Sequence, residues 1–373
     1  MTDARPAGAR DVPGRFALYV KFALALAVVG FIASRVRLPD NRFYIRAAEQ
    51  MITPGCAEIH CFRVLVPWTI GALPGNWLLK WKAYAVLCNA AAAITVFDLS
   101  LFFGLNRRAS IIAGALTAFG FGSFSTLWQP YNSDPLMYWW APVVMRWALE
   151  DRTAAAGLLA SVGVFAKEFS VVPLAIAGIA AAGDRRWSRA FRAAAAGAIA
   201  FGAWVALQLF LRLRFGYTFG PNLSPRFFEG SYLFFWLHEM SPRGALSAMF
   251  NEFGPIWLLI PLGWLAAPRE LRRVVVAAVP IVGLYAYLQQ PDRALWNFHF
   301  LASPLAALVL ESTTNAFVWV FVAVYAFAYL KVGAEVAFVP QARYAYAVGL
   351  VLALAALVTF MRSRRERPPV EPS

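Results

Sequence analysis

Long apolar runs recur along almost the whole chain, and they limit what it can fold into. A helix needs roughly 20 apolar residues to cross a bilayer, fewer when it packs among other helices. With 60% hydrophobic residues, 14% charged residues and a mean hydropathy of +0.58, the 373-residue chain has the composition of a membrane protein. We predict an all-α fold, a polytopic transmembrane helical bundle. Its twelve or so predicted spans are 16–34, 83–104, 110–128, 135–150, 153–166, 170–182, 190–212, 253–267, 274–290, 298–312, 315–337 and 344–361.

The arginines predict the orientation of this bundle. An even number of spans leaves both termini on one side, and the short loops of that side are rich in arginine, at 107–108, 185–192, 269–273 and 362–367. Loops of this kind stay in the cytoplasm, so both termini are predicted to be cytoplasmic. The net charge of +14 has the same origin, and no nucleic-acid-binding motif accompanies it.

The predicted organisation is one membrane domain with two outer loops. It comprises a cytoplasmic tail at 1–15, the transmembrane domain at 16–361 with outer loops 35–63 and 213–252, and a second tail at 362–373. The expected location is a cell membrane, the bacterial inner membrane in particular, with membrane lipids as neighbours.

Two apolar runs are each compatible with two arrangements in the membrane. The run 64–79 is broken by Pro67, Pro74 and Gly75, and counting it as a span would put every later arginine cluster outside. It is therefore predicted to be an interfacial or re-entrant piece. The run 153–182 would be about 45 Å long as one helix, so we predict two short helices that turn at Lys167 and Glu168.

This topology brings several polar segments to the outer side. They are the first loop, with Asp40, Tyr44, Arg63 and His60, the turn 129–135 with Asp134, the tip at Lys167 and Glu168, and the connector 290–293 with Arg293. Charged groups are costly near a membrane, and their concentration there predicts a functional site.

The order of four short motifs resembles the GT-C class of integral-membrane glycosyltransferases, the mannosyltransferase-like enzymes among them. The motifs are Asp40-Asn41-Arg42-Phe43-Tyr44, Phe62-Arg63-Val64-Leu65-Val66-Pro67, Asn132-Ser133-Asp134-Pro135 and Phe165-Ala166-Lys167-Glu168. The resemblance implies a polyprenyl-phosphate-linked sugar as donor, Asp40 as catalytic base, and Lys167 as the lysine at the tip of a helical hairpin. The chain departs from the class in having no acidic pair in its first loop.

The chemistry of these residues agrees with that implication. Glycosyl transfer from a lipid phosphate needs a carboxylate that accepts the proton of an acceptor hydroxyl, and cations that stabilise the departing phosphate. Asp40 supplies the first, and Lys167 with Arg293 supplies the second. Glu168, Asp134, Arg63 and Tyr44 complete the predicted substrate-binding set. No metal site or other cofactor is predicted, while the sugar, the acceptor and a requirement for a divalent metal ion are left open.

Structural alternatives remain for these residues. Asp40 and Asp134 are also suited to cap helices, and Lys167 with Glu168 to form a pair that neutralises itself. Arg293 is also suited to be an interface anchor, and Arg63 to mark the start of the broken apolar segment. His60 and His299 are suited to be packed or headgroup-facing side chains. Cys56 and Cys61 permit a disulfide, or less readily a metal site with His60, whereas Cys88 is expected in a helix core.

Two other classes of protein compete with an enzyme. A transporter or flippase of lipid or polysaccharide also has about twelve spans, but it is expected to show matching halves with charges near the bilayer midplane. A noncatalytic partner of an export system would keep the fold without the chemistry.

Overall fold

The computed structural model describes residues 14–33, 41–218, 250–288, 295–332, 337–338 and 342–365. Two predicted site residues, Asp40 and Arg293, lie outside these ranges. So does most of the second predicted outer loop, because the description stops at Thr218 and resumes at Phe250.

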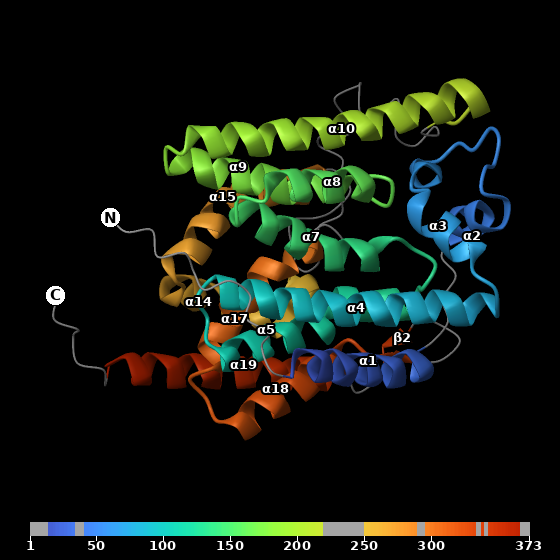
Figure 1. Cartoon of the computed structure of the whole chain (residues 1–373). Helices are drawn as coiled ribbons and strands as arrows, with labels where there is room; N and C mark the ends of the chain where they lie inside the picture. Colours follow the sequence, from blue (N-terminus) through green and yellow to red (C-terminus); the bar gives the residue numbers. More distant parts are fainter. Residues whose placement is uncertain are drawn as a thin grey trace.

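The first half of the chain is a stack of antiparallel helices (Figure 1). Helix α1 packs on α4, α4 packs on α5 and α7, α7 packs on α8 and α9, and α10 covers α8 and α9. The bounds are α1 Arg15–Ile32, α4 Trp77–Phe102, α5 Arg107–Ala118, α6 Phe121–Trp128, α7 Asp134–Leu149, α8 Thr153–Gly163, α9 Val172–Gly183 and α10 Trp187–Phe215.

The second half adds helices that pack against several members of this stack and against one another. Helix α17 packs on α5 and α14, α15 packs on α9, and α18 pairs with α19. The bounds are η3 Gly254–Leu258, α14 Ile260–Ala266, α15 Arg269–Leu288, η4 Leu295–Phe298, α17 His299–Leu310, α18 Asn315–Ala328 and α19 Ala342–Arg365. The largest hydrophobic core contains residues from both halves, from Phe22 to Phe360.

Three short helices lie beyond one end of the stack, at the right in Figure 1. They are α2 Asn41–Gln50, η1 Ile59–Phe62 and α3 Leu65–Ala72. Helices α2 and α3 touch closely at Gly71, where an added Cβ would lie 2.0 Å from the carbonyl oxygen of Ala48. A glycine is therefore required at this crossing, because any side chain would push the two helices apart.

The helices support the assignment of a multi-pass membrane protein. Among the described residues, five are long and apolar enough to cross a bilayer: α1, α4, the α5–α6 segment Arg107–Trp128, α10 and α19. Shorter apolar helices lie between them. Every predicted span contains helix, but the number that cross the membrane remains a prediction.

The structure corrects two predicted boundaries. The predicted span 315–337 ends early, because α18 stops at Ala328 and a small antiparallel hairpin follows, β1 Lys331–Val332 with β2 Ala337–Phe338. Helix α4 starts at Trp77 rather than at 83, since the side chain of Asn76 caps it by accepting from the backbone N–H of Leu79. The broken run 64–79 is thus α3, a short link and the first turn of α4.

The break in the run 153–182 occurs where it was predicted. Helix α8 ends at Gly163, Lys167 has an extended backbone, and the short 3₁₀ helix η2 Glu168–Val171 leads into α9. The turn lies at the same end of the stack as α2 and α3.

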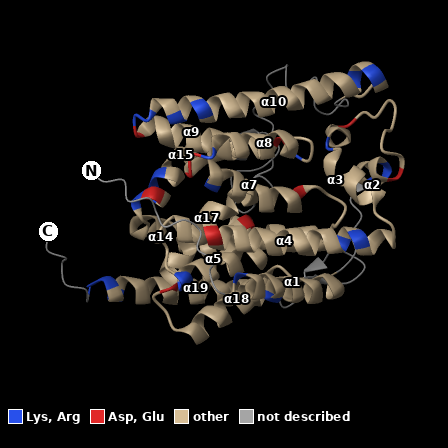
Figure 2. Ribbon diagram, viewed as in Figure 1, with Lys and Arg blue, Asp and Glu red and all other residues tan. Residues whose placement is uncertain are grey.

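Basic residues lie at both ends of the stack (Figure 2), and those at the end with α2 and α3 include Arg212 and Arg214 in the last turn of α10. The start of α10, the start of α15 and the end of α19 carry the arginines of the predicted cytoplasmic loops, at the left in this view.

Candidate active site

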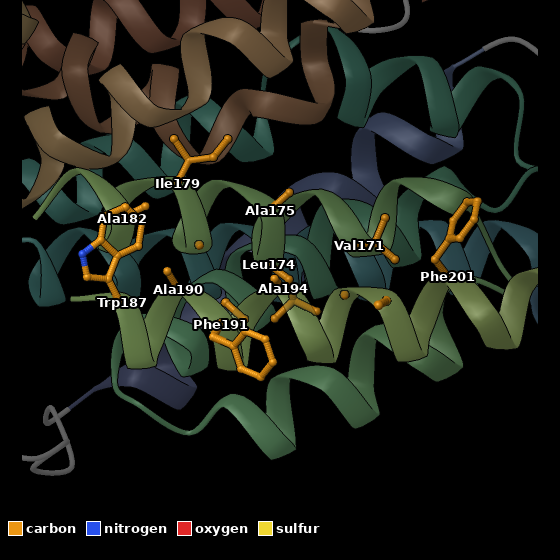
Figure 3. Close-up of a pocket in the computed structure, with 14 residues that line it drawn as sticks. Val171, Leu174, Ala175, Ile179, Ala182, Trp187, Ala190, Phe191, Ala194 and Phe201 are labelled. Atoms are coloured by element: carbon orange, nitrogen blue, oxygen red, sulfur yellow. The ribbon is translucent and has the colours of Figure 1, made fainter. Parts of the chain in front are cut away.

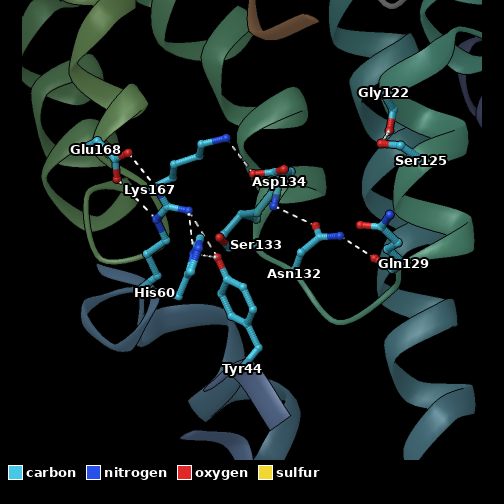
Figure 4. Close-up of polar contacts among 12 residues, drawn as sticks. Tyr44, His60, Gly122, Ser125, Gln129, Asn132, Ser133, Asp134, Lys167 and Glu168 are labelled. Atoms are coloured by element: carbon cyan, nitrogen blue, oxygen red, sulfur yellow. Dashed lines mark hydrogen bonds and ion pairs between the residues drawn. The ribbon is translucent and has the colours of Figure 1, made fainter. Parts of the chain in front are cut away.

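Six polar side chains from four separate segments meet at the end of the stack that carries α2 and α3 (Figure 4). Tyr44 comes from α2, and His60 and Arg63 come from η1 and the residue after it. Asp134 opens α7, and Lys167 and Glu168 form the turn between α8 and α9. We call this group the polar cluster. It contains five of the seven predicted site residues.

Lys167 and Asp134 form the first ion pair of the cluster. The Nζ of Lys167 donates to Oδ1 of Asp134 at 2.7 Å, and the lysine side chain is only 8% exposed. Asp134 lies in the first turn of α7, where the helix dipole favours a negative charge. Its interpretation as the N-cap is wrong, because Ser133 is the cap residue and the Asp134 carboxylate turns to Lys167.

Arg63 and Glu168 form the second ion pair. Nη2 of Arg63 donates to Oε1 of Glu168 at 2.7 Å, and Nε donates to Oε2 at 3.3 Å, so the contact is bidentate. Burial alone would lower the pKa of Arg63, but the Glu168 carboxylate and the Tyr44 hydroxyl more than offset it, so the pKa is raised. Since Lys167 and Glu168 have different partners, the idea that they neutralise each other is wrong.

Tyr44 and His60 extend the cluster from Arg63. Nη1 of Arg63 donates to the Tyr44 hydroxyl at 3.3 Å and lies 3.2 Å from Nδ1 of His60. Because a guanidinium can only donate, Nδ1 accepts in this geometry, and the Tyr44 hydroxyl also lies 3.2 Å from it. Burial raises the pKa of Tyr44, so its hydroxyl stays protonated at neutral pH.

His60 is more closely tied to the site than the sequence predicts. The expected packed or headgroup-facing histidine contacts both Arg63 and Tyr44. The spacing of three residues between His60 and Arg63 is a sequence pattern that could have indicated their contact, because side chains three apart on a 3₁₀ turn lie one above the other. His299 is different: it is fully buried in α17, stacked on Trp296 and bonded to that residue's carbonyl oxygen.

A disulfide between Cys56 and Cys61 closes the loop beside the cluster, with the two Cα atoms 6.3 Å apart. The same loop is fastened to the end of α10: Gly55 donates to the carbonyl oxygen of Phe215, and Thr218 donates to that of Cys56. This anchors the residues that lead to Arg63. A metal site made of Cys56, His60 and Cys61 does not form, because both sulfurs are used in the disulfide.

The described part of the chain contains no group of three or more His, Cys, Asp or Glu residues placed to hold a metal ion. Arg293 and Asp40 fall outside that part, so their predicted roles remain predictions. Helix α2 starts at Asn41, directly after Asp40 in the sequence.

An apolar groove of about 810 Å³ runs along the seam between α9 and α10 (Figure 3). One end is at Val171 and Phe201, and the other is at Ala182 and Trp187. Val171 belongs to η2, the 3₁₀ turn that begins with Glu168. One end of the groove is therefore at the 3₁₀ turn that also contains Glu168, and the groove continues from there along α9 and α10. Small residues make room for it, including Gly178, Ala190, Ala194 and Gly197.

Known proteins resemble this chain in structure but not detectably in sequence. No protein-family model and no curated protein matches this chain. The structure, however, is similar to that of ArnT from Cupriavidus metallidurans in the apo state, with a TM-score of 0.54 and 14% identity over 93% of this chain and 75% of that one. It is also similar to the Archaeoglobus fulgidus oligosaccharyltransferase in the apo form, with a TM-score of 0.52 and 14% identity over 93% of this chain and 55% of that one.

The fold is thus similar to the folds of these two membrane proteins, which confirms the predicted helical membrane fold. It is also the kind of fold that the resemblance to the GT-C class implies. The chain spans about half the length of the archaeal oligosaccharyltransferase. At 14% identity the likeness concerns the fold, so the reaction of this chain has to be argued from its own residues.

Proposed function

We propose that this protein is an integral-membrane glycosyltransferase that transfers a sugar from a polyprenyl-phosphate donor to an acceptor hydroxyl at the extracytoplasmic face of the membrane. The observation that carries the proposal is the polar cluster at the mouth of the apolar groove, in a chain with the GT-C fold. A lipid-linked sugar has the matching chemistry, with an anionic phosphate between a polar sugar and a long apolar chain.

The cations of the cluster provide the electrostatics of the reaction. Lys167 contacts the donor phosphate and, with Arg293, stabilises the negative charge that grows on it as the bond to the sugar breaks. Arg63 is held in place by Glu168 and Tyr44, and it adds positive charge to the same site. Because the cluster is largely buried, each of these interactions is stronger than it would be in water.

Asp40 is proposed as the general base. It accepts the proton of the acceptor hydroxyl as that oxygen forms a bond to the anomeric carbon, while the polyprenyl phosphate leaves with the electron pair of the broken bond. Asp40 directly precedes α2, the helix whose Tyr44 belongs to the polar cluster.

The groove between α9 and α10 is proposed to hold the apolar chain of the donor. It begins at Val171, four residues beyond Lys167, and none of the residues that line it is charged. When the phosphate of a lipid binds at the cluster, its apolar chain can therefore lie in this groove.

Two observations support the proposed orientation. The starts of α10 and α15 and the end of α19 carry the arginines of the short predicted loops and lie opposite the cluster (Figure 2), and short arginine-rich loops favour the cytoplasm. The disulfide of Cys56 and Cys61 lies beside the cluster, and disulfides persist in oxidising compartments outside the cytoplasm.

The test uses the purified full-length protein in lipid nanodiscs, incubated with a panel of polyprenyl-phosphate sugars and candidate acceptors. Release of polyprenyl phosphate and formation of a glycosylated product are measured. We expect turnover with one donor class and a loss of about 10²–10⁴ in turnover for Asp40→Asn, which removes the base but keeps the size of the side chain. Turnover within a few-fold of the parent would exclude Asp40 as the base.

The same experiment separates the other two classes of protein. A donor that binds but is never consumed with any acceptor supports a noncatalytic partner of an export system. Movement of an unchanged lipid between the leaflets of a proteoliposome supports a flippase.

A further inference from the structure

The lysine that is proposed to bind the donor phosphate already holds an anion. Lys167 is paired with the Asp134 carboxylate at 2.7 Å, and the whole residue is only 7% exposed. A phosphate that approaches Lys167 therefore meets a cation whose charge is already neutralised at close range.

The four charges in the two ion pairs are balanced. Arg63 and Lys167 supply two positive charges, and Asp134 and Glu168 supply two negative charges. The phosphodiester of a lipid-linked sugar brings one more negative charge. In a largely buried site the phosphate and these carboxylates compete for the same cations, so a carboxylate gives up its cation when the phosphate binds to that cation.

The geometry decides which carboxylate leaves. Glu168 is held by two hydrogen bonds from the planar fork of Arg63, and both would have to break. Lys167 is joined to Asp134 by one hydrogen bond, to Oδ1, and the negative charge of Asp134 keeps the support of the α7 helix dipole after that bond is lost. Asp134 is therefore the carboxylate that exchanges at lower cost.

We infer that the donor phosphate displaces Asp134 from Lys167, so that Asp134 is an internal competitor for the phosphate site and sets the affinity for the donor. The inference rests on the proposed function, because it assigns a phosphate to Lys167. Its consequence is unusual in sign: removing a charged residue from the binding site strengthens binding.

The experiment titrates the full-length protein in nanodiscs with polyprenyl phosphate and measures the dissociation constant. Asp134→Asn has nearly the same size but competes poorly for a lysine. It is expected to bind about tenfold more tightly than the parent, which corresponds to about 1.4 kcal/mol. Asp134→Ala removes the acceptor altogether and is expected to change affinity in the same direction. Thermal unfolding of each variant checks that it is folded.

Two controls isolate the exchange from a general gain of positive charge. In the Lys167→Ala background, Asp134→Asn is expected to change the affinity less than twofold, because the competed cation is gone. Asp151→Asn removes an ion pair with Arg192 at the start of α10, at the other end of the stack, and is expected to leave the affinity unchanged.

The outcomes separate the inference from the function on which it rests. If the parent binds polyprenyl phosphate and Lys167→Ala weakens binding, but Asp134→Asn binds no more tightly than the parent, the exchange is wrong and the phosphate site stands. The exchange is also wrong if tightening persists without Lys167, since it then reflects charge alone. If neither the parent nor Asp134→Asn binds the lipid, the proposed donor itself is wrong.

Discussion

Replacing Glu168 by glutamine tests the bidentate ion pair that fixes Arg63 in the polar cluster. Two charge-assisted hydrogen bonds join the residues, at 2.7 and 3.3 Å, and bonds of this type contribute about 1.5–3 kcal/mol each. Glutamine keeps one acceptor oxygen, so one bond survives in weaker form. The Glu168 side chain is 25% exposed, and water offsets part of the loss. We therefore expect a loss of about 2 kcal/mol in the free energy of unfolding, below the range of about 3–5 kcal/mol for fully buried pairs.

The assay is thermal unfolding in detergent at pH 7, with Glu150→Gln as the matched control. Glu150 accepts from Nε of Arg146 at the same 2.7 Å and is 24% exposed, but the two residues are four apart on one helix. Pairs of that kind contribute about 0.3–0.5 kcal/mol, so the control is expected to cost much less. Equal losses in the two variants, or no loss in either, would refute the argument that the bidentate geometry stabilises the site.

The pH dependence supplies a second check on the same pair. Burial alone would raise the pKa of Glu168, but Arg63 and Lys167 hold it below its usual value of 4.5. A carboxyl with a lower pKa in the folded state stabilises the fold above the unfolded pKa, and that contribution disappears as the pH falls through the folded pKa. The difference between parent and Glu168→Gln is therefore expected to be constant from pH 6 to 8 and to shrink only below about pH 4.5. A difference that shrinks already between pH 6 and 5 would contradict the assignment.

Three further predictions concern the groove, the disulfide and the topology. Gly178→Leu is expected to fill the groove and weaken binding of polyprenyl phosphate several-fold. The fold should tolerate the new side chain, because a Cβ at Gly178 meets only ordinary contacts, the nearest at 3.5 Å. The control is Gly202→Leu on α10, outside the groove lining, which should leave binding unchanged. Equal weakening by both would show that the groove has no specific role. Replacing Cys56 and Cys61 together by serine is expected to cost about 2 kcal/mol of stability through the freed short loop, and a reductant should lower the stability of the parent but not of the variant. A cysteine placed at Ser188, with the native cysteines replaced, is expected to resist a reagent confined to the exterior; labelling from outside would reverse the proposed orientation.

The sequence predicted the class and most of the helices because hydropathy and proline are local signals. Apolar composition along 16–34 or 190–212 has few outcomes other than a helix in lipid. The charged pair at Lys167 and Glu168 likewise marked a break, since ions are costly in a span. The prediction was wrong for the run 315–337, because α18 stops at Ala328 before two paired strands. The long apolar first part of the run outweighed Lys331, Gly333 and Glu335, which interrupt the pattern after that residue.

The tertiary structure decided which charged residues form ion pairs. Lys167 and Glu168 are neighbours in sequence, but the backbone at Lys167 is extended, so successive side chains point to opposite sides and each finds another partner. Glu168 pairs with Arg63, 105 residues away, and Lys167 pairs with Asp134, 33 residues away. Sequence alone determined that most charged residues gather near the ends of the apolar runs, since lipid excludes them. Their pairing required the packing of α2, η1, α7 and the α8–α9 turn against one another, because an ion pair depends on positions in space that no local pattern records.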